Sequence, residues 1–484
     1  CAHPAAPPGA GDPPPALSLP AEVRPLRYAL ELALVPQRDR FEGTVAIEVE
    51  LARPLRRVWL HARDLAIREA AVEVAGEARP AAVEAVTPEG AARLTVAAGL
   101  PPGRATLRLR FDGAWAARGP GLARTGAGAG AFAFARLGPG EARRVFPCLD
   151  DPALLAPFEV ALTVPERATA VSSAPAAGEE PLAGGLKRVR FAPTAPIPAH
   201  LLALAAGPFD AREPPPLPAA GPRAAPLPVR LLWPRGGREP AAALESARAL
   251  VPIVEGWLAT AFPYPRLELV AVPAADERAG VAAGALVAPE GALAFDPARD
   301  DAGQPLRVGA LVARGLARQW FEGLVAPAGP DDAWIPAGLA ALVERVALEA
   351  WQPEAGVGEE EARAVVAAVR RSGLPSDRPL RPGRLRAGAA WPALDAGGAV
   401  QAAAVLRAAE RFAGEERLRA GLAAHLAAHA RGAASTDALL DALARASEPA
   451  LAPALRALLD APGAPLLEAR AACGAPAPRV ELAA

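Results

Sequence analysis

The sequence predicts an α+β protein of more than one domain, with a strand-rich amino-terminal part followed by a region dominated by helices. Short runs in which apolar and polar residues alternate, such as 44–51 and 105–111, are typical of half-buried antiparallel strands. The proline-rich stretch 214–222 breaks this pattern. After Pro228, helical patterns take over. A chain of 484 residues is long enough for roughly three domains of about 100 to 200 residues each.

These changes of pattern divide the chain into four segments. Residues 1–16 are rich in Pro, Gly and Ala, which predicts a flexible tether without a packed core. Residues 17–213 are predicted to form the β-rich domain, 214–227 a linker, and 228–484 a second domain whose last third, from about Ala399, is helical throughout. The clearest predicted helices cover 241–259, 306–322, 338–350 and 359–371.

Composition excludes several classes of partner. The net charge is −1, so bulk electrostatics gives no attraction for nucleic acid, and we expect no nucleic-acid partner. No apolar run reaches the roughly 18 residues that a membrane-spanning helix needs. Because 52% of the residues are hydrophobic, the chain can bury a core and should fold.

Several segments resemble the zinc aminopeptidases of the membrane alanyl aminopeptidase family. Residues 23–32 and 41–45 are similar to the family's opening strands, and 142–152 (ARRVFPCLDDP) resembles its A-R-R-x-F-P-C-F-D-E-P segment. Residues 262–270 and 331–334 continue the similarity in the same order. The resemblance implies an amino-terminal antiparallel β saddle domain, followed by a thermolysin-like α/β domain with a helical carboxy-terminal end.

The segment 311–321 (LVARGLARQWF) resembles the zinc helix of that family, but the chemically active residues are replaced. In the family, H-E-x-x-H places two zinc-binding histidines on one helical face, with the glutamate as general base. Here Arg314 and Arg318 stand at the histidine positions and Gly315 at that of the glutamate, while the third ligand aligns with Ala337. A guanidinium has no free lone pair for a metal, so zinc, expected in the family, is predicted to be absent and no other cofactor is expected.

Two further catalytic groups of the family are replaced. The exopeptidase motif G-x-M-E-N, whose glutamate holds the free amino group of the substrate, aligns with 280–284 and puts Ala283 at the glutamate. The transition-state tyrosine aligns with Ala399. Combined loss of these groups predicts a non-catalytic relative, a pseudo-peptidase that acts by binding or scaffolding, with an unknown protein or peptide as its partner.

The remaining candidates leave alternatives open. Arg314 and Arg318 lie on one helical face and could bind an anion, or they could pair with acids such as Asp331, Asp332 or Glu344, or point to solvent. His425 and His429, four residues apart, have the spacing of a zinc-binding pair, and the alternative function is a metallo-aminopeptidase-like hydrolase with a rearranged site. Helix-end packing is the simpler role for these two residues. His3, His61 and His200 are isolated in the sequence.

The given sequence begins with Cys1 and contains no methionine. We expect that a signal peptide is removed before Cys1 and that this cysteine carries lipid, as in a bacterial lipoprotein. The predicted location is then the bacterial cell envelope, on the periplasmic or outer-membrane side, with the lipid as membrane anchor. The alternative is an arbitrary start of the sequence.

Overall fold

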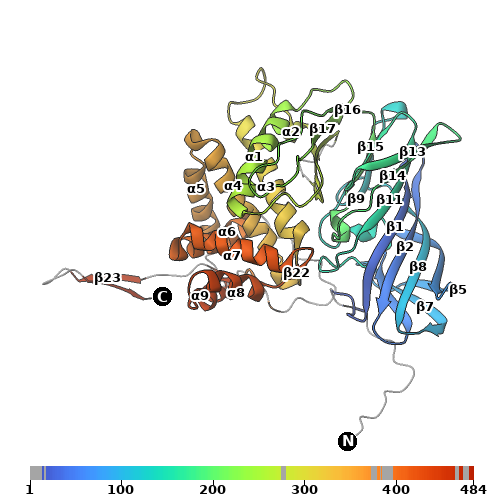
Figure 1. Cartoon of the computed structure of the whole chain (residues 1–484), viewed down its shortest axis with the longest axis horizontal. Helices are drawn as coiled ribbons and strands as arrows, with labels where there is room; N and C mark the ends of the chain where they lie inside the picture. Colours follow the sequence, from blue (N-terminus) through green and yellow to red (C-terminus); the bar gives the residue numbers. More distant parts are fainter. Residues whose placement is uncertain are drawn as a thin grey trace, which may run out of the picture.

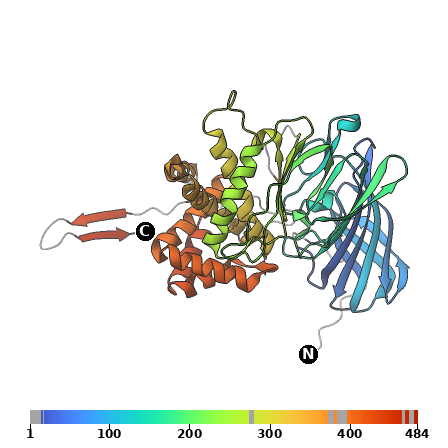
Figure 2. The same ribbon diagram turned by 45° about the horizontal axis from the view of Figure 1, so that its top comes forward.

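The fold has a strand-rich amino-terminal part and a helix-rich carboxy-terminal part, which lie side by side in Figures 1 and 2. It was obtained as a computed structural model, which describes residues 14–15, 18–273, 280–371, 379–381, 383, 396–463, 468–472 and 479–483. The predicted order of a β-rich domain followed by an α/β domain with a helical end is confirmed.

The amino-terminal domain is built on an eight-stranded sheet with the order β13-β14-β11-β1-β2-β8-β4-β5. Neighbouring strands run antiparallel as predicted, except that β1 and β11 are parallel. These strands are β1 (Val23–Ala33), β2 (Arg40–Leu51), β4 (Leu65–Val74), β5 (Glu77–Pro80), β8 (Gly103–Ala114), β11 (Phe158–Pro165), β13 (Ala176–Leu182) and β14 (Leu186–Phe191).

Alternation of residue type explains why this sheet has one buried face. Along β8, Leu107, Leu109 and Phe111 are buried, whereas Arg108 and Arg110 between them point to the other face. Two smaller sheets complete the domain, with the orders β3-β7-β6 and β12-β15-β10-β9. Their strands are β3 (Leu55–His61), β6 (Ala82–Ala85), β7 (Ala91–Leu100), β9 (Gly121–Thr125), β10 (Phe132–Arg136), β12 (Thr169–Ser172) and β15 (Leu204–Gly207).

The second domain begins with a five-stranded sheet of order β16-β17-β18-β20-β19. Its strands are β16 (Phe209–Arg212), β17 (Val229–Pro234), β18 (Leu267–Val272), β19 (Gly280–Ala282) and β20 (Ala285–Pro289). Strands β17, β18 and β20 run parallel, and β18 and β20 are buried along their whole length, as in sheets covered on both faces. Because β16 pairs with β17, the predicted first domain, ending at residue 213, includes one strand that belongs to the second sheet.

The helices of the second domain pack against one another beside this sheet (Figure 1). They are α1 (Ala241–Leu258), the short α2 (Glu290–Leu293), α3 (Gln304–Arg318), α4 (Trp334–Trp351), α5 (Val357–Arg371), α6 (Ala396–Ala413), α7 (Glu415–His429), α8 (Thr436–Ala446) and α9 (Leu451–Asp460). The helix predicted over 306–322 is split, since α3 ends at Arg318 and continues as a wider π-helical turn, Gln319–Leu324. None of the helices in the described ranges is both long and apolar enough to cross a bilayer.

The expectation that the last third is helical throughout is wrong at two places. β22 (Gly432–Ala434) pairs with β21 (Val325–Pro327), and β23 (Glu468–Ala472) forms a hairpin with β24 (Arg479–Ala483). The alanine content of these short segments favours a helix locally, whereas pairing with a second strand determines the outcome.

Candidate functional site

The positions that correspond to the family's zinc site lie on two neighbouring helices. Arg314, Gly315 and Arg318 lie on α3, and Ala337 lies on α4, which packs directly against α3. The side chain of Arg314 is exposed, Gly315 is buried, and Arg318 is partly buried. The structure therefore places these four predicted positions on two helices that pack against each other.

Arg314 is paired with a carboxylate of α4. Its Nε donates to Glu344 Oε2 at 2.6 Å and its Nη2 donates to Glu344 Oε1 at 3.1 Å. Burial raises the pKa of Glu344, while Arg314 acts to lower it. One of the internal pairings expected from the sequence, Arg314 with Glu344, is therefore formed.

Arg318 begins a hydrogen-bonded chain, through Glu322 to His200, that links the two domains. Its Nε donates to Glu322 Oε2 at 2.6 Å, and His200 Nε2 lies 2.9 Å from Glu322 Oε1. Burial alone would raise the pKa of Glu322, but Arg318 and His200 outweigh this effect and lower it to about 2. Because His200 lies in the amino-terminal domain and Glu322 in the π-helical turn after α3, this contact ties the domains together.

The predicted exopeptidase segment lies beside the same helix. Gln319 Nε2 donates to the Ala282 carbonyl at 3.0 Å, and the Gly284 amide donates to Gln319 Oε1 at 2.9 Å. Ala283 is buried at this junction, and its amide donates to the Leu201 carbonyl of the amino-terminal domain at 2.8 Å. The position that aligns with the glutamate of the motif carries only a methyl group.

Gly315 packs closely against strand β20, and Ala399 lies on a helix that packs against α4. A Cβ atom added to Gly315 would lie 2.9 Å from Leu286 Cδ1, so a larger residue would have to displace that side chain. Ala399 lies on α6, whose Ala402 Cβ would lie 2.8 Å from a Cβ added to Gly338 of α4. The structure therefore places Ala399 on a helix that packs against the helix of Ala337.

The donor set at these positions does not fit zinc. Two of the ligand positions carry permanent cations, the third carries a methyl group, and Gly315 cannot activate a water molecule. Across the described ranges, no group of three or more His, Cys, Asp or Glu side chains is arranged to hold a metal ion. We therefore derive no catalytic step that passes through zinc.

His425 and His429 form a close pair near the end of α7. Their ring centroids are 5.1 Å apart. His425 is buried, and burial together with His429 lowers its pKa to about 4. A neutral ring could bind a metal, but within the described part of the chain these two residues belong to no cluster of three potential ligands. Metal binding at this pair stays a prediction.

The sequence did not reveal the importance of His200 and Glu322. His200 is isolated in the sequence, and Glu322 is the last residue of the helix predicted over 306–322. The available signal was the i, i+4 spacing of Arg318 and Glu322. The structure also pairs Arg314 and Arg318 with two different acids, so anion binding by both arginines stays a prediction that requires at least one pair to open. Cys1, the predicted lipidation site, lies outside the described residues.

Comparisons with known proteins match this architecture. The family model for the peptidase M1 N-terminal domain matches residues 24–201, and that for the peptidase family M1 domain matches 242–459. The chain is similar to aminopeptidase M1-D of Oryza sativa subsp. japonica, with 27% identity over 84% of this chain and 46% of the relative. It is also similar to aminopeptidase M1 of Arabidopsis thaliana, with 28% identity over 84% of this chain and 46% of the relative.

Human glutamyl aminopeptidase is 26% identical over 67% of this chain and 35% of its own length. The chain spans less than half the length of the curated relatives that it matches. The two family models nevertheless cover both domains and most of the chain, in the order seen in the fold. Because family models match both of its domains, this chain belongs to peptidase family M1.

Proposed function

We propose that this protein is a non-catalytic member of peptidase family M1 that acts by binding or scaffolding. The observation that carries the proposal is the pairing of both arginines at the ligand positions with acids of the protein itself, Arg314 with Glu344 and Arg318 with Glu322. The Arg314–Glu344 pair joins α3 to α4 without needing a metal. Gly315 supports the same proposal, because its position offers no general base.

Retention of the surrounding fold supports a role in binding. Trp320 and Trp334 are almost fully buried, and Trp334 Nε1 donates to Thr436 Oγ1 at 2.9 Å. A chain that loses its reactive groups while keeping its packing can still present a surface that binds another molecule.

The partner that we propose is a protein or peptide. Anchoring at the bacterial cell envelope through lipid on Cys1 belongs to the same proposal. Mass spectrometry of the amino-terminal peptide of the natural protein tests the anchor.

The experiment that tests the loss of catalysis measures zinc and hydrolysis together. Zinc content of the purified protein is determined by mass spectrometry, and a panel of aminoacyl reporter substrates is followed with and without added zinc. We expect substoichiometric zinc and no turnover above a protein-free control. The His425→Ala, His429→Ala double variant is the matched control. Stoichiometric zinc and turnover in the wild type, with both lost in the double variant, would establish the rearranged hydrolase instead.

A further inference from the structure

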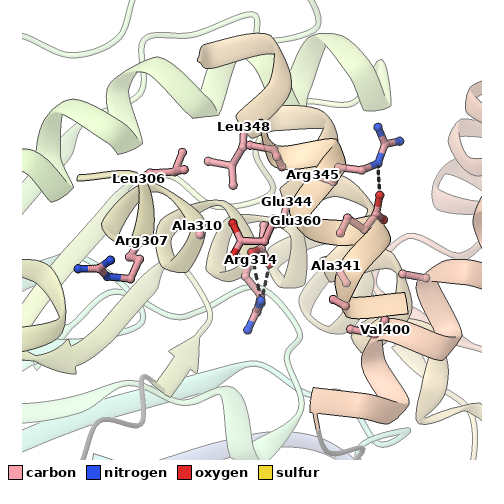
Figure 3. A pocket seen from close by; sticks show the side chains of 14 residues that line it. Leu306, Arg307, Ala310, Arg314, Ala341, Glu344, Arg345, Leu348, Glu360 and Val400 are labelled. Atoms are coloured by element: carbon pink, nitrogen blue, oxygen red, sulfur yellow. Dashed lines mark hydrogen bonds and ion pairs between the residues drawn. The ribbon is translucent and has the colours of Figure 1, made fainter. Parts of the chain in front are cut away.

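A cavity of about 260 Å³ opens between α3, α4, α5 and α6 (Figure 3). Its apolar wall includes Leu306, Ala310 and Leu348, and Val400 lies across the cavity from Leu306 and Ala310 (Figure 3). The volume lies just below the roughly 300 to 1,000 Å³ of pockets for drug-sized ligands, so a smaller occupant fits it better. Charged side chains from three helices line the rest of the cavity.

Most of these charges are already neutralised. Arg345 pairs with Glu349 at 2.5 Å and with Glu361 at 3.5 Å, and Arg407 also pairs with Glu361. Arg307, at the other end of the cavity, pairs with Asp301 at 2.8 Å. A ligand would therefore gain little from these groups unless it broke an existing pair.

The centre of the cavity has a different balance of charge. Glu344 and Glu360 lie near each other there, with the guanidinium of Arg314 beside them (Figure 3). Arg314 pairs with Glu344, whereas Glu360, from the first turn of α5, makes no side-chain hydrogen bond or ion pair with the described residues. The side chain of Glu344 is 14% exposed and that of Arg314 is 62% exposed, so the guanidinium covers the buried acid from the solvent side.

We propose that this cavity binds a small organic cation, namely a primary ammonium or guanidinium group on a short apolar chain. Glu360 attracts the charged head, the apolar wall receives the chain, and Arg314 acts as an internal competitor for Glu344. An anion beside Glu360 would meet a carboxylate that no cation of the described residues neutralises, which disfavours it. This assignment goes beyond the loss of catalysis and does not depend on it, because no hydrolytic step is involved.

The test uses pentylammonium as the probe and neutral 1-pentanol as its match in size, with affinities from isothermal titration calorimetry. Pentylammonium should bind more tightly than pentanol. Glu360→Gln should weaken pentylammonium binding about fivefold, as expected for about 1 kcal/mol from a partly exposed charge pair. Glu359→Gln is the matched control, because Glu359 pairs with Arg363 on the exposed side of α5 and does not line the cavity.

Substitution of Arg314, which competes with the ligand for Glu344, is the most discriminating test of the proposal. Arg314→Gln removes the guanidinium that covers Glu344, so it should tighten pentylammonium binding severalfold and leave pentanol binding unchanged. Circular dichroism checks that each variant is folded, and Arg314→Lys, which keeps the charge, should bind about as the wild type does. Equal affinity for the two probes, weaker binding in Arg314→Gln, or no binding by either wild type or Arg314→Gln would overturn the proposal. Peptide hydrolysis by the wild type would contradict only the proposed function.

Discussion

His200 Nε2 and Glu322 Oε1 lie 2.9 Å apart across the boundary between the two domains, and both side chains are almost completely buried. Glu322 also accepts a hydrogen bond from Arg318, which stands at one of the family's histidine positions. Arg318, which aligns with a metal-ligand position of the family, therefore belongs to a hydrogen-bonded chain that reaches the amino-terminal domain. The helix that resembles the family's zinc helix is therefore tied to the domain boundary in this protein.

We expect Glu322 to make the free energy of unfolding depend on pH in the acid range. Its pKa falls from 4.5 to about 2 on folding, because Arg318 and His200 outweigh the effect of burial. A lowered pKa stabilises the fold above the unfolded value, by about 3 kcal/mol, and this contribution is lost as the pH falls from about 4.5 toward 2. Glu322→Gln should therefore lower stability at pH 7 and flatten the acid limb of the stability curve. Urea unfolding at a series of pH values measures both effects.

The control for this prediction is Glu180→Gln. Glu180 pairs with Arg190 on the surface, and both side chains are more than half exposed. Such a pair contributes little, so the control should follow the wild-type curve at all pH values. An acid limb that is as steep in Glu322→Gln as in the wild type would contradict the role given to Glu322.

His200 should couple the unfolding of the two domains. His200→Ala removes a partner of the buried Glu322 carboxylate and opens space at the boundary, whereas His200→Gln keeps a hydrogen-bond donor. We expect a single calorimetric transition in the wild type, two separated transitions in His200→Ala, and an intermediate result in His200→Gln. Two equally separated transitions in the wild type would show that this contact does not couple the domains.

Gly323 should be intolerant of any side chain. A Cβ atom there would lie 2.3 Å from the hydroxyl oxygen of Tyr264, whose ring is buried. Gly323→Ala should therefore lower the free energy of unfolding by about 1 to 3 kcal/mol, the usual range for overpacking. Gly256→Ala in α1 is the control, since a Cβ there meets no atom within 4 Å. Because alanine favours a helix, the control should be neutral or stabilising by up to about 1 kcal/mol in the same urea titration.

The elements predicted best are those whose pattern is local. β8 alternates strictly, so Leu107 and Leu109 could be assigned to the buried face before its partners were known. The domain boundary predicted at residue 213 separates β16 from its partner β17, which follows only after the proline-rich stretch. A strand of four residues carries no local signal of the strand with which it pairs. The sequence does not predict the π-helical turn after Arg318, because the spacing of apolar residues does not distinguish it from a continuing α-helix.

In the candidate site too, features set by local sequence could be predicted, whereas contacts between distant segments could not. The replaced positions Arg314, Gly315 and Arg318 could be read from one motif, and Glu344 was among the partners foreseen for the arginines. The contact of His200 with Glu322 joins residues 122 positions apart, and no periodicity links them. A single sequence gives residue types and local spacing, while contacts between distant segments depend on how the domains pack.

Thr436 should be needed to join the start of α4 to the start of α8. Its amide and Oγ1 donate to Asp332 Oδ1 at 2.6 and 2.7 Å, and it accepts from Trp334 Nε1 at 2.9 Å. Thr436→Val keeps the shape but leaves the Trp334 donor without its partner and removes one hydrogen bond to Asp332. Since an unsatisfied buried polar group costs about 1 to 3 kcal/mol, we expect a loss of stability in that range.

The conservative variant separates hydrogen bonding from packing at the same position. Thr436→Ser keeps the hydroxyl and removes only a methyl group, so it should retain most of the stability that Thr436→Val loses. Both changes are measured as shifts of the urea midpoint at constant slope, with tryptophan fluorescence as the probe because Trp334 lies in the contact. If Thr436→Ser were as unstable as Thr436→Val, the lost methyl packing rather than the hydroxyl network would be what holds α4 and α8 together.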